Sequence, residues 1–146
     1  KKNNMKNLML TIGVFFFALT MQSQSVIGKW KTIDDETGEA KSIVEIYEKS
    51  GKIYGKVVDI LRDSHKKDVC VKCDGAEKNK PILGMVIMNG LKKDGSEYNG
   101  GTILDPTSGK KYKCYLALES ADKLKLRGYV GISLMGRTQY WTRVKN

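Results

Sequence analysis

The sequence predicts an all-β protein, and within that class an eight-stranded antiparallel up-and-down barrel. Short runs of β-type residues recur from residue 26 onward, turn-forming residues separate nearly all of them, and no stretch shows a convincing helical period of 3.6 residues. Because most connections are short, consecutive strands are expected to pair as antiparallel neighbours. Closure into a barrel would then remove the exposed edges of the sheet.

Eight runs are expected to form the strands, and turn residues bound nearly all of them. In chain order they cover residues 26–33, 42–48, 52–61, 82–90, 97–105, 111–120, 123–132 and 137–144. The connections "KSG", "KKDGS" and "AD" carry the Gly, Asp or Ser that tight hairpins use. In "DPTSGK", Pro106 has the fixed φ that suits a type I turn, and Gly109 is free to become left-handed.

Alternation assigns faces to the later strands. One face of 111–120 and of 123–132 is expected to carry Tyr112, Cys114, Leu116, Leu118, Leu124, Leu126, Gly128, Val130 and Ile132. The run 82–90 is apolar on both faces, which indicates a central or covered strand. Eight strands enclose an interior that is either filled by side chains or able to hold one small ligand.

The N-terminal segment is expected to be a signal peptide over residues 1–25, which leaves 26–146 as a single domain. Lys1, Lys2 and Lys6 form a basic start, an apolar run follows over 8–21, and small polar residues close the segment. The apolar run is short for a membrane span, although an uncleaved anchor helix is an alternative. The expected location is therefore outside the cytoplasm, in the periplasm, with no membrane span in the mature chain.

The charge pattern does not favour nucleic acid as a partner. The chain carries a net charge of +10, and removal of the three leader lysines from the 26 basic residues leaves 23 against 16 acidic ones, or +7. These lysines are scattered among acidic residues, without a basic stripe or interleaved aromatic residues. A solvated basic surface is the expected result.

One connection, over residues 62–81, is long and polar, and it holds two of the three cysteines. A disulfide between Cys70 and Cys73 is the expected state in an oxidising compartment. Two alternatives remain: a zinc half-site completed by His65 and an aspartate, and a redox-active Cys-x-x-Cys pair. The second ligand pair of a strong zinc motif is missing, and no helix is expected beside the cysteines to activate a thiol. Cys114 is expected to be a buried, inert thiol.

No catalytic arrangement emerges from the sequence, and neither an enzyme nor a cofactor is expected. His65 is the chain's single histidine, no nucleophile has a recognisable base beside it, and the acidic residues are too scattered to pair. "NGGT" follows a turn and enters a strand, unlike the glycine-rich loops that cradle phosphate at a helix start.

Six motifs in order resemble the secreted bacterial family called domain of unknown function 2147: "GKW", "IYGKV", "KPILGM", "NGGTILDPTSGKKY", "LKLRGYVG" and "GRTQYWTRV". The resemblance covers residues 26–146 and implies a secreted β-barrel, but the family has no established biochemical role. The residues that carry its motif most specifically are Gly100, Gly101, Asp105, Pro106, Gly109, Arg127 and Gly128.

A second resemblance is to the lipocalin-like, or calycin, signature of Gly-x-Trp in a first strand and Arg in the last. It implies that Gly28, Trp30 and Arg143, or Arg137 in its place, close one end of the barrel. A guanidinium can stack on an indole while it donates to backbone carbonyls. Arg127 is expected to be solvated or in a cross-strand pair, for example with Asp105.

These expectations favour a non-catalytic protein that binds a small apolar or amphipathic ligand, or an envelope protein partner. The side chains expected at the interior or its entrance are Tyr54, Met85, Met88, Tyr112, Val130 and Met135. A structural or stress-related envelope protein with a filled barrel, and a metal- or redox-active cysteine loop, are the alternatives.

Overall fold

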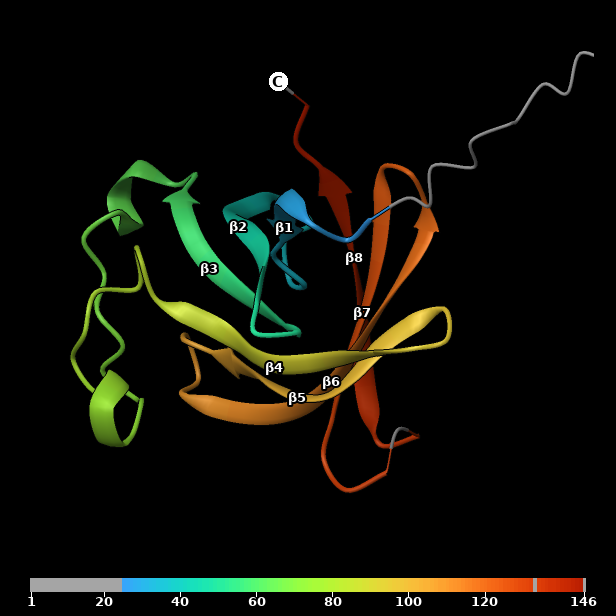
Figure 1. The fold of residues 1–146 in the computed structure, drawn as a ribbon. Helices are drawn as coiled ribbons and strands as arrows, with labels where there is room; N and C mark the ends of the chain where they lie inside the picture. The colour runs from blue at the N-terminus through green and yellow to red at the C-terminus, as the bar shows by residue number, and fades with distance from the viewer. Residues whose placement is uncertain (1–24, 133, 146) are drawn as a thin grey trace, which may run out of the picture.

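The chain folds into a closed barrel of eight antiparallel strands in sequence order, as expected (Figure 1). The computed structural model describes residues 25–132 and 134–145; the expected signal peptide therefore lies almost wholly outside the described residues. The strands are β1 (Gly28–Ile33), β2 (Ala40–Lys49), β3 (Lys52–Ile60), β4 (Val86–Asp94), β5 (Glu97–Asp105), β6 (Lys110–Ser120), β7 (Lys123–Tyr129) and β8 (Gly136–Arg143). Closure comes from the pairing of β1 with β8. Over the residues that the structure describes, no helix is long and apolar enough to cross a membrane.

Strand β4 corrects the expected range of 82–90. Residues 82–85 form a turn instead, because Met85 donates its N–H to the carbonyl of Ile82 and Gly84, with φ +89°, donates to the carbonyl of Val57. At its other end β4 continues to Asp94, opposite Glu97, so that the hairpin needs only a short turn. Of the expected connection "KKDGS", residues 92–94 thus belong to β4, and Gly95 and Ser96 form the turn.

Strand β7 also ends earlier than expected, at Tyr129. We call residues 130–132 and 134–135 the β7–β8 loop, in which Val130 donates its N–H to the carbonyl of Met135. Val130 and Ile132 were expected to extend the inner face of the strand. They are 66% and 62% exposed instead, because the chain leaves the sheet before them.

The register places one continuous set of apolar side chains inside the barrel, since residues opposite each other in an antiparallel pair share a face. Trp30 lies opposite Val44, Cys114 opposite Gly128, and Leu124 opposite Trp141. The fully buried inner side chains are Trp30, Val44, Ile46, Met88, Leu91, Cys114, Leu116 and Leu124, each 0% exposed. Because water reaches none of them, this part of the interior is filled, and each large side chain contributes about 1.5–3 kcal/mol relative to exposure.

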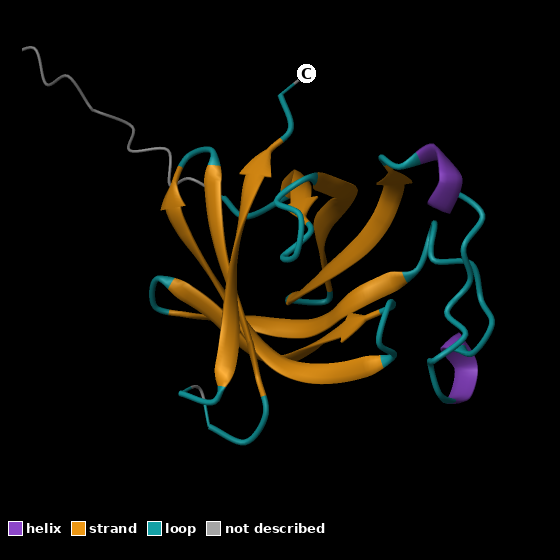
Figure 2. Ribbon diagram, turned by 180° about the vertical axis from the view of Figure 1, so that it is seen from behind, coloured by secondary structure: helices purple, strands orange, loops and turns teal. Residues whose placement is uncertain are grey.

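The long connection between β3 and β4 packs against the outside of the barrel, beside the β5–β6 turn. We call residues 61–85 the β3–β4 segment; it contains the short 3-10 helices η1 (Asp63–His65) and η2 (Gly75–Glu77) (Figure 2). Ile87 and Leu104 adjoin the inward-facing pair Met88 and Ile103, so they face outward, yet both are buried. Both belong to the buried apolar cluster that also contains Cys70, Cys73 and the barrel interior. The β3–β4 segment meets β5 at the β5–β6 turn, where Sγ of Cys70 lies 3.2 Å from the carbonyl oxygen of Pro106.

Candidate functional site

The two ends of the barrel are built differently. At one end, which we call the closed end, the guanidinium of Arg143 lies 4.3 Å from the Trp30 ring centroid. It donates to the carbonyls of Ser25, Ile27 and Ala121 at 2.6, 3.0 and 2.8 Å. The other end, which carries the β1–β2, β3–β4, β5–β6 and β7–β8 connections, we call the far end.

Glycine is required where Arg143 crosses the chain. Gly28 has φ +134°, and a Cβ there would lie 2.9 Å from Nη1 of Arg143. Gly28, Trp30 and Arg143 thus come together as the lipocalin-like signature implies, and their contacts are structural. Arg137 lies elsewhere, near the far end.

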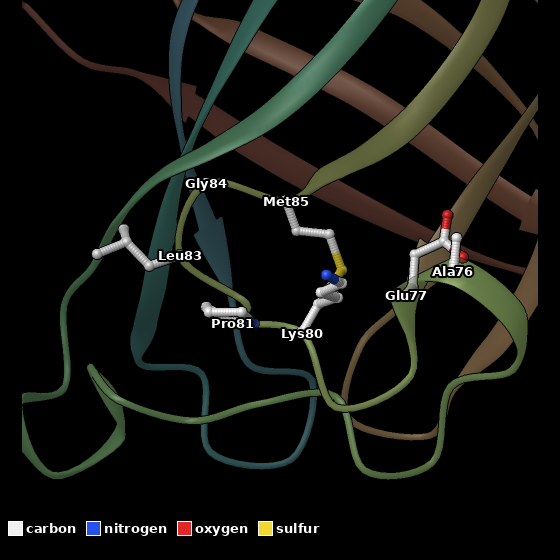
Figure 3. Close-up of a pocket in the computed structure, with 7 residues that line it drawn as sticks. All are labelled: Ala76, Glu77, Lys80, Pro81, Leu83, Gly84 and Met85. Carbon is white, nitrogen blue, oxygen red and sulfur yellow. The ribbon is translucent and has the colours of Figure 1, made fainter.

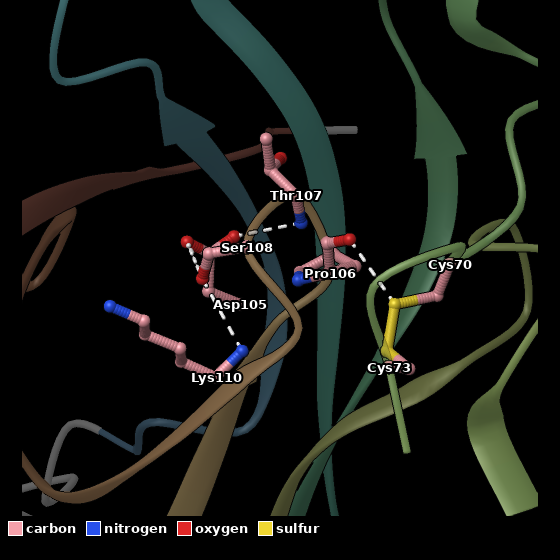
Figure 4. The surroundings of a disulfide bond; sticks show 7 residues. All are labelled: Cys70, Cys73, Asp105, Pro106, Thr107, Ser108 and Lys110. Carbon is pink, nitrogen blue, oxygen red and sulfur yellow. Dashed lines mark hydrogen bonds between the residues drawn. A yellow bond between two sulfur atoms is a disulfide. The ribbon is translucent and has the colours of Figure 1, made fainter.

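Three of the seven family-motif residues, Asp105, Pro106 and Gly109, form a turn against which the β3–β4 segment packs (Figure 4). Gly109 has φ +73°, and a Cβ there would overlap the carbonyl of Lys72. Sγ of Cys70 lies 3.2 Å from the carbonyl oxygen of Pro106, which is a contact rather than a hydrogen bond because a disulfide sulfur carries no hydrogen. Asp105 fixes the turn, since its carboxylate accepts from the Thr107 N–H and the Ser108 hydroxyl.

The remaining motif residues shape the sheet itself. Gly100, with φ +78°, lies at an irregularity of the β5–β6 register, and a Cβ on Gly101 would overlap the carbonyl of Asn89 on β4. Gly128 faces the interior near Tyr112. Arg127 makes its cross-strand hydrogen bond to the Thr138 hydroxyl at 2.8 Å, on the outside of the barrel.

The disulfide between Cys70 and Cys73 is present, with a Cα–Cα distance of 5.4 Å in the usual range. Both residues are buried, so the bond is packed into the fold although it lies in the long polar connection. As disulfide sulfurs they are not available as zinc ligands. His65 instead contacts Asp68, with 2.7 Å between Nδ1 and Oδ2, at the surface. Within 25–132 and 134–145, no three potential ligands are grouped to hold a metal.

The predicted ligand-binding residues do not lie together, and Tyr54 does not face the interior of the barrel. It lies on the outer face, where its ring stacks on Tyr47 at 5.8 Å between centroids, because the inner face at this point belongs to its neighbour Gly55, against Met88. Met88 is inside but fully buried. Tyr112 faces inward and is partly accessible. Val130 and Met135 are exposed in the β7–β8 loop.

Met85 lines a hollow of about 310 Å³ whose wall residues all belong to the β3–β4 segment (Figure 3). Its walls are Ala76, Glu77, Lys80, Pro81, Leu83, Gly84 and Met85. Another hollow, of about 450 Å³, adjoins the closed end near Lys29 and Tyr47. Both are broad and open to solvent, which is unlike the enclosed sites that surround most of a small ligand.

Water does reach the inner face of the barrel near the far end. Along β7 and β8 the inward pairs are Leu124 with Trp141, Leu126 with Gln139, and Gly128 with Arg137. The first pair is buried, Gln139 is partly accessible, and the Arg137 side chain is 77% exposed. The far end is therefore where the interior can meet a ligand.

A polar network occupies this accessible inner face. Oδ2 of Asp35, in the β1–β2 connection, accepts from Nη1 of Arg137 at 3.1 Å and from Nε2 of Gln139 at 2.8 Å. Oε1 of Gln139 accepts from Nε1 of Trp141 at 3.0 Å, and Trp141 is buried. We call Arg137 and Gln139 the donor pair.

Sequence reasoning missed Asp35, Gln139 and Trp141. The alternation of "RTQYW" places Arg137, Gln139 and Trp141 on one face, and that signal was available. Asp35 follows no such rule, because it lies in the turn "DDETGE" and meets the donor pair only through barrel closure.

Comparison with known proteins agrees with this architecture. The structure is similar to that of protein HP1028 from the human pathogen Helicobacter pylori, which belongs to the lipocalin family; the TM-score is 0.75 at 24% sequence identity, over 85% of this chain and 86% of that one. That likeness shows a lipocalin-like barrel. No curated protein matches the chain significantly. The model of a family described as an uncharacterized protein conserved in bacteria (DUF2147) matches residues 28–143, and the chain therefore belongs to this family.

Proposed function

We propose that this protein binds a small amphipathic molecule at the far end of its barrel and is not an enzyme. The observation that carries the proposal is the donor pair on the accessible inner face. It lies next to apolar inner side chains, at the end of the barrel opposite the closed end. A few fixed polar groups at the rim of an apolar interior are the usual composition of a small-molecule site. The lipocalin-like fold supports the same class of function.

The filled part of the interior limits the size of the ligand. Trp30, Met88, Cys114 and the other fully buried inner side chains fill much of the barrel, so a long chain would have to displace packed residues. A ligand with a short apolar part can instead lie near Tyr112, Ile103 and Leu126, with its polar group at the donor pair.

The chain's two tryptophans provide the test. Trp30 donates its indole N–H to Val26 at the closed end, whereas Trp141 donates to Gln139 beneath the proposed site. In a two-dimensional ¹H–¹⁵N spectrum, titration with octanoate or octanol should shift the Trp141 indole signal and leave that of Trp30 in place. Equal shifts of both signals, or none, would count against a site at the far end.

The protein is proposed to work outside the cytoplasm, in the periplasm. The basic and apolar N-terminal pattern supports export, and the Cys70–Cys73 disulfide supports an oxidising compartment. Fractionation of the native host, followed by intact mass measurement of the mature chain, tests both the location and the cleavage.

A second candidate is a protein that acts through its outer surface on an envelope partner. The observation that favours it is the β7–β8 loop, in which Leu134 and Met135 are 83% and 68% exposed. A photoreactive residue in place of Leu134 should then crosslink one defined partner, and the octanoate and octanol titrations should leave both indole signals unchanged.

A further inference from the structure

We infer that the ligand of the far end is a carboxylate, and that the Asp35 side chain occupies the carboxylate's place until the ligand binds. This inference rests on the proposed function and names the chemical class of its ligand. The donor pair already binds a carboxylate of the protein itself, because one oxygen of Asp35 accepts hydrogen bonds from both of its members.

The donor pair has the chemistry of a carboxylate site. A guanidinium supplies charge and a planar set of N–H groups, and the amide of Gln139 adds a neutral donor to the same oxygen. Hydrogen bonds to an ionised oxygen are about twice as strong as neutral ones. An alcohol of the same length would lose this charge-assisted part of the interaction.

A hydrogen bond from the buried Trp141 fixes the orientation of the Gln139 side-chain amide. An amide side chain can present either its oxygen or its NH₂ group, and the indole of Trp141, which can only donate, takes the oxygen. Nε2 of Gln139 therefore faces the far end as a donor. Trp141 is buried opposite Leu124, so this orientation is built into the core and does not depend on Asp35.

Asp35 can leave the donor pair without loss of its own turn. The adjacent Asp34 holds that turn, because its Oδ1 accepts from the N–H groups of Glu36 and Thr37 and its Oδ2 pairs with Arg62 at 3.1 Å. Among the described residues, the Asp35 carboxylate makes hydrogen bonds and an ion pair with the donor pair alone. Exchange of Asp35 for a ligand carboxylate is therefore a local side-chain movement.

The surroundings suit a short apolar part below the carboxylate. Leu126 lies opposite Gln139, and Gly128 lies opposite Arg137, with no side chain to cover the arginine. A Cβ on Gly128 would lie 3.6–3.9 Å from Tyr112 and Ile103, so these two side chains form the adjacent inner wall.

The test compares octanoate with octanol by isothermal titration calorimetry on the mature protein. Octanoate should bind about three- to fivefold more tightly than octanol, which corresponds to about 0.6–1 kcal/mol for a largely exposed charge-assisted contact. Asp35→Asn removes the competing charge, and should tighten octanoate binding about three- to fivefold, which is more than it tightens octanol binding. Arg137→Gln should weaken octanoate binding toward the octanol value.

Asp122→Asn is the matched control. Asp122 also forms a surface ion pair, with Lys145 at 3.1 Å, but at the closed end, so its substitution should leave the affinity for octanoate unchanged. If Asp35→Asn does not fold, the Arg137→Gln measurement decides alone. Equal affinities of octanoate and octanol, unaffected by Asp35→Asn or Arg137→Gln, would overturn the inference and keep the proposed function. Absence of binding by both probes would overturn the two together.

Discussion

Arg143 spans the closed end of the barrel over the face of Trp30, with its guanidinium 4.3 Å from the ring centroid and three of its N–H groups bonded to backbone carbonyls. Arg143→Ala should lower the free energy of unfolding by about 2 kcal/mol, because the carbonyls and the indole lose one shared partner. Arg143→Lys should recover only part of the loss, since an ammonium group lacks the planar fork. Urea unfolding followed by tryptophan fluorescence measures both variants.

Arg137→Ala, on the same strand, is the control for this prediction. Its ion pair with Asp35 is largely exposed, and exposed pairs contribute about 0–1 kcal/mol. A loss for Arg137→Ala as large as that for Arg143→Ala would contradict a special role of the closed end.

Gly109, the glycine of the β5–β6 turn, is predicted to be harder to replace than Gly95 of the β4–β5 turn. Gly109→Ala places a Cβ against the carbonyl of Lys72 in addition to the cost of a left-handed φ of +73°. Gly95→Ala carries the second cost alone, since Gly95 has φ +62° and nothing lies within 4 Å of its Cβ position. Gly109→Ala should therefore destabilise the protein by about 1–3 kcal/mol more than Gly95→Ala. Equal unfolding midpoints of the two variants would show that the β3–β4 segment can shift away at no cost.

Cys114 is predicted to be unreactive in the folded protein. It is fully buried, and burial raises the pKa of its thiol to about 12, so the reactive thiolate is scarce at pH 8. A thiol-specific reagent should therefore detect no thiol in the native protein. It should detect one per chain in denaturant without reductant, because Cys70 and Cys73 are joined, and three after reduction. Three thiols in denaturant before reduction would disprove the disulfide.

The carboxylate of Asp34 is predicted to make stability depend on pH in the acid range. Hydrogen bonds from the backbone N–H of Glu36 and of Thr37, with help from Arg62, hold its pKa below the usual 3.8. A group whose pKa is lower in the folded state stabilises that state at any pH above its pKa in the unfolded chain. This stabilisation is lost as the pH falls through its pKa in the folded state. The difference in stability between the wild type and Asp34→Asn should thus be constant above about pH 5 and shrink below pH 3.8. Urea midpoints measured between pH 2 and pH 6 check this, and a difference that persists unchanged at pH 2 would contradict it.

The barrel itself could be predicted from the sequence because its rules are local. Alternation marked the inner face of β6 and β7, short turns with Gly and Asp forced antiparallel neighbours, and Trp30 with Arg143 indicated the closed end. The errors arose where a turn depended on the rest of the fold. Gly84 bonds back to Val57 on β3, and this distant contact decides where β4 begins.

The donor pair and the packing of the β3–β4 segment were beyond sequence rules for a related reason. Asp35 and Arg137 are about one hundred residues apart in the sequence. No periodicity relates a turn after the first strand to a residue of the last strand, and closure of the barrel alone brings them together. The two cysteines suggested a clip on a polar loop. Their burial, with Sγ of Cys70 against the carbonyl oxygen of Pro106, follows from tertiary packing, which composition does not reveal.

Both ends of the described chain leave the barrel beside Arg143, where Ser25 accepts its hydrogen bond and Val144 bonds to Lys29 (Figure 1). A tether attached to either terminus would accordingly hold the molecule by its sealed base, and the surface with Asp35 and the β7–β8 loop would point away from the support. Immobilised protein should be fully competent for ligand or partner capture whichever terminus carries the tag, and a fused reporter domain at either terminus would stand clear of the same surface.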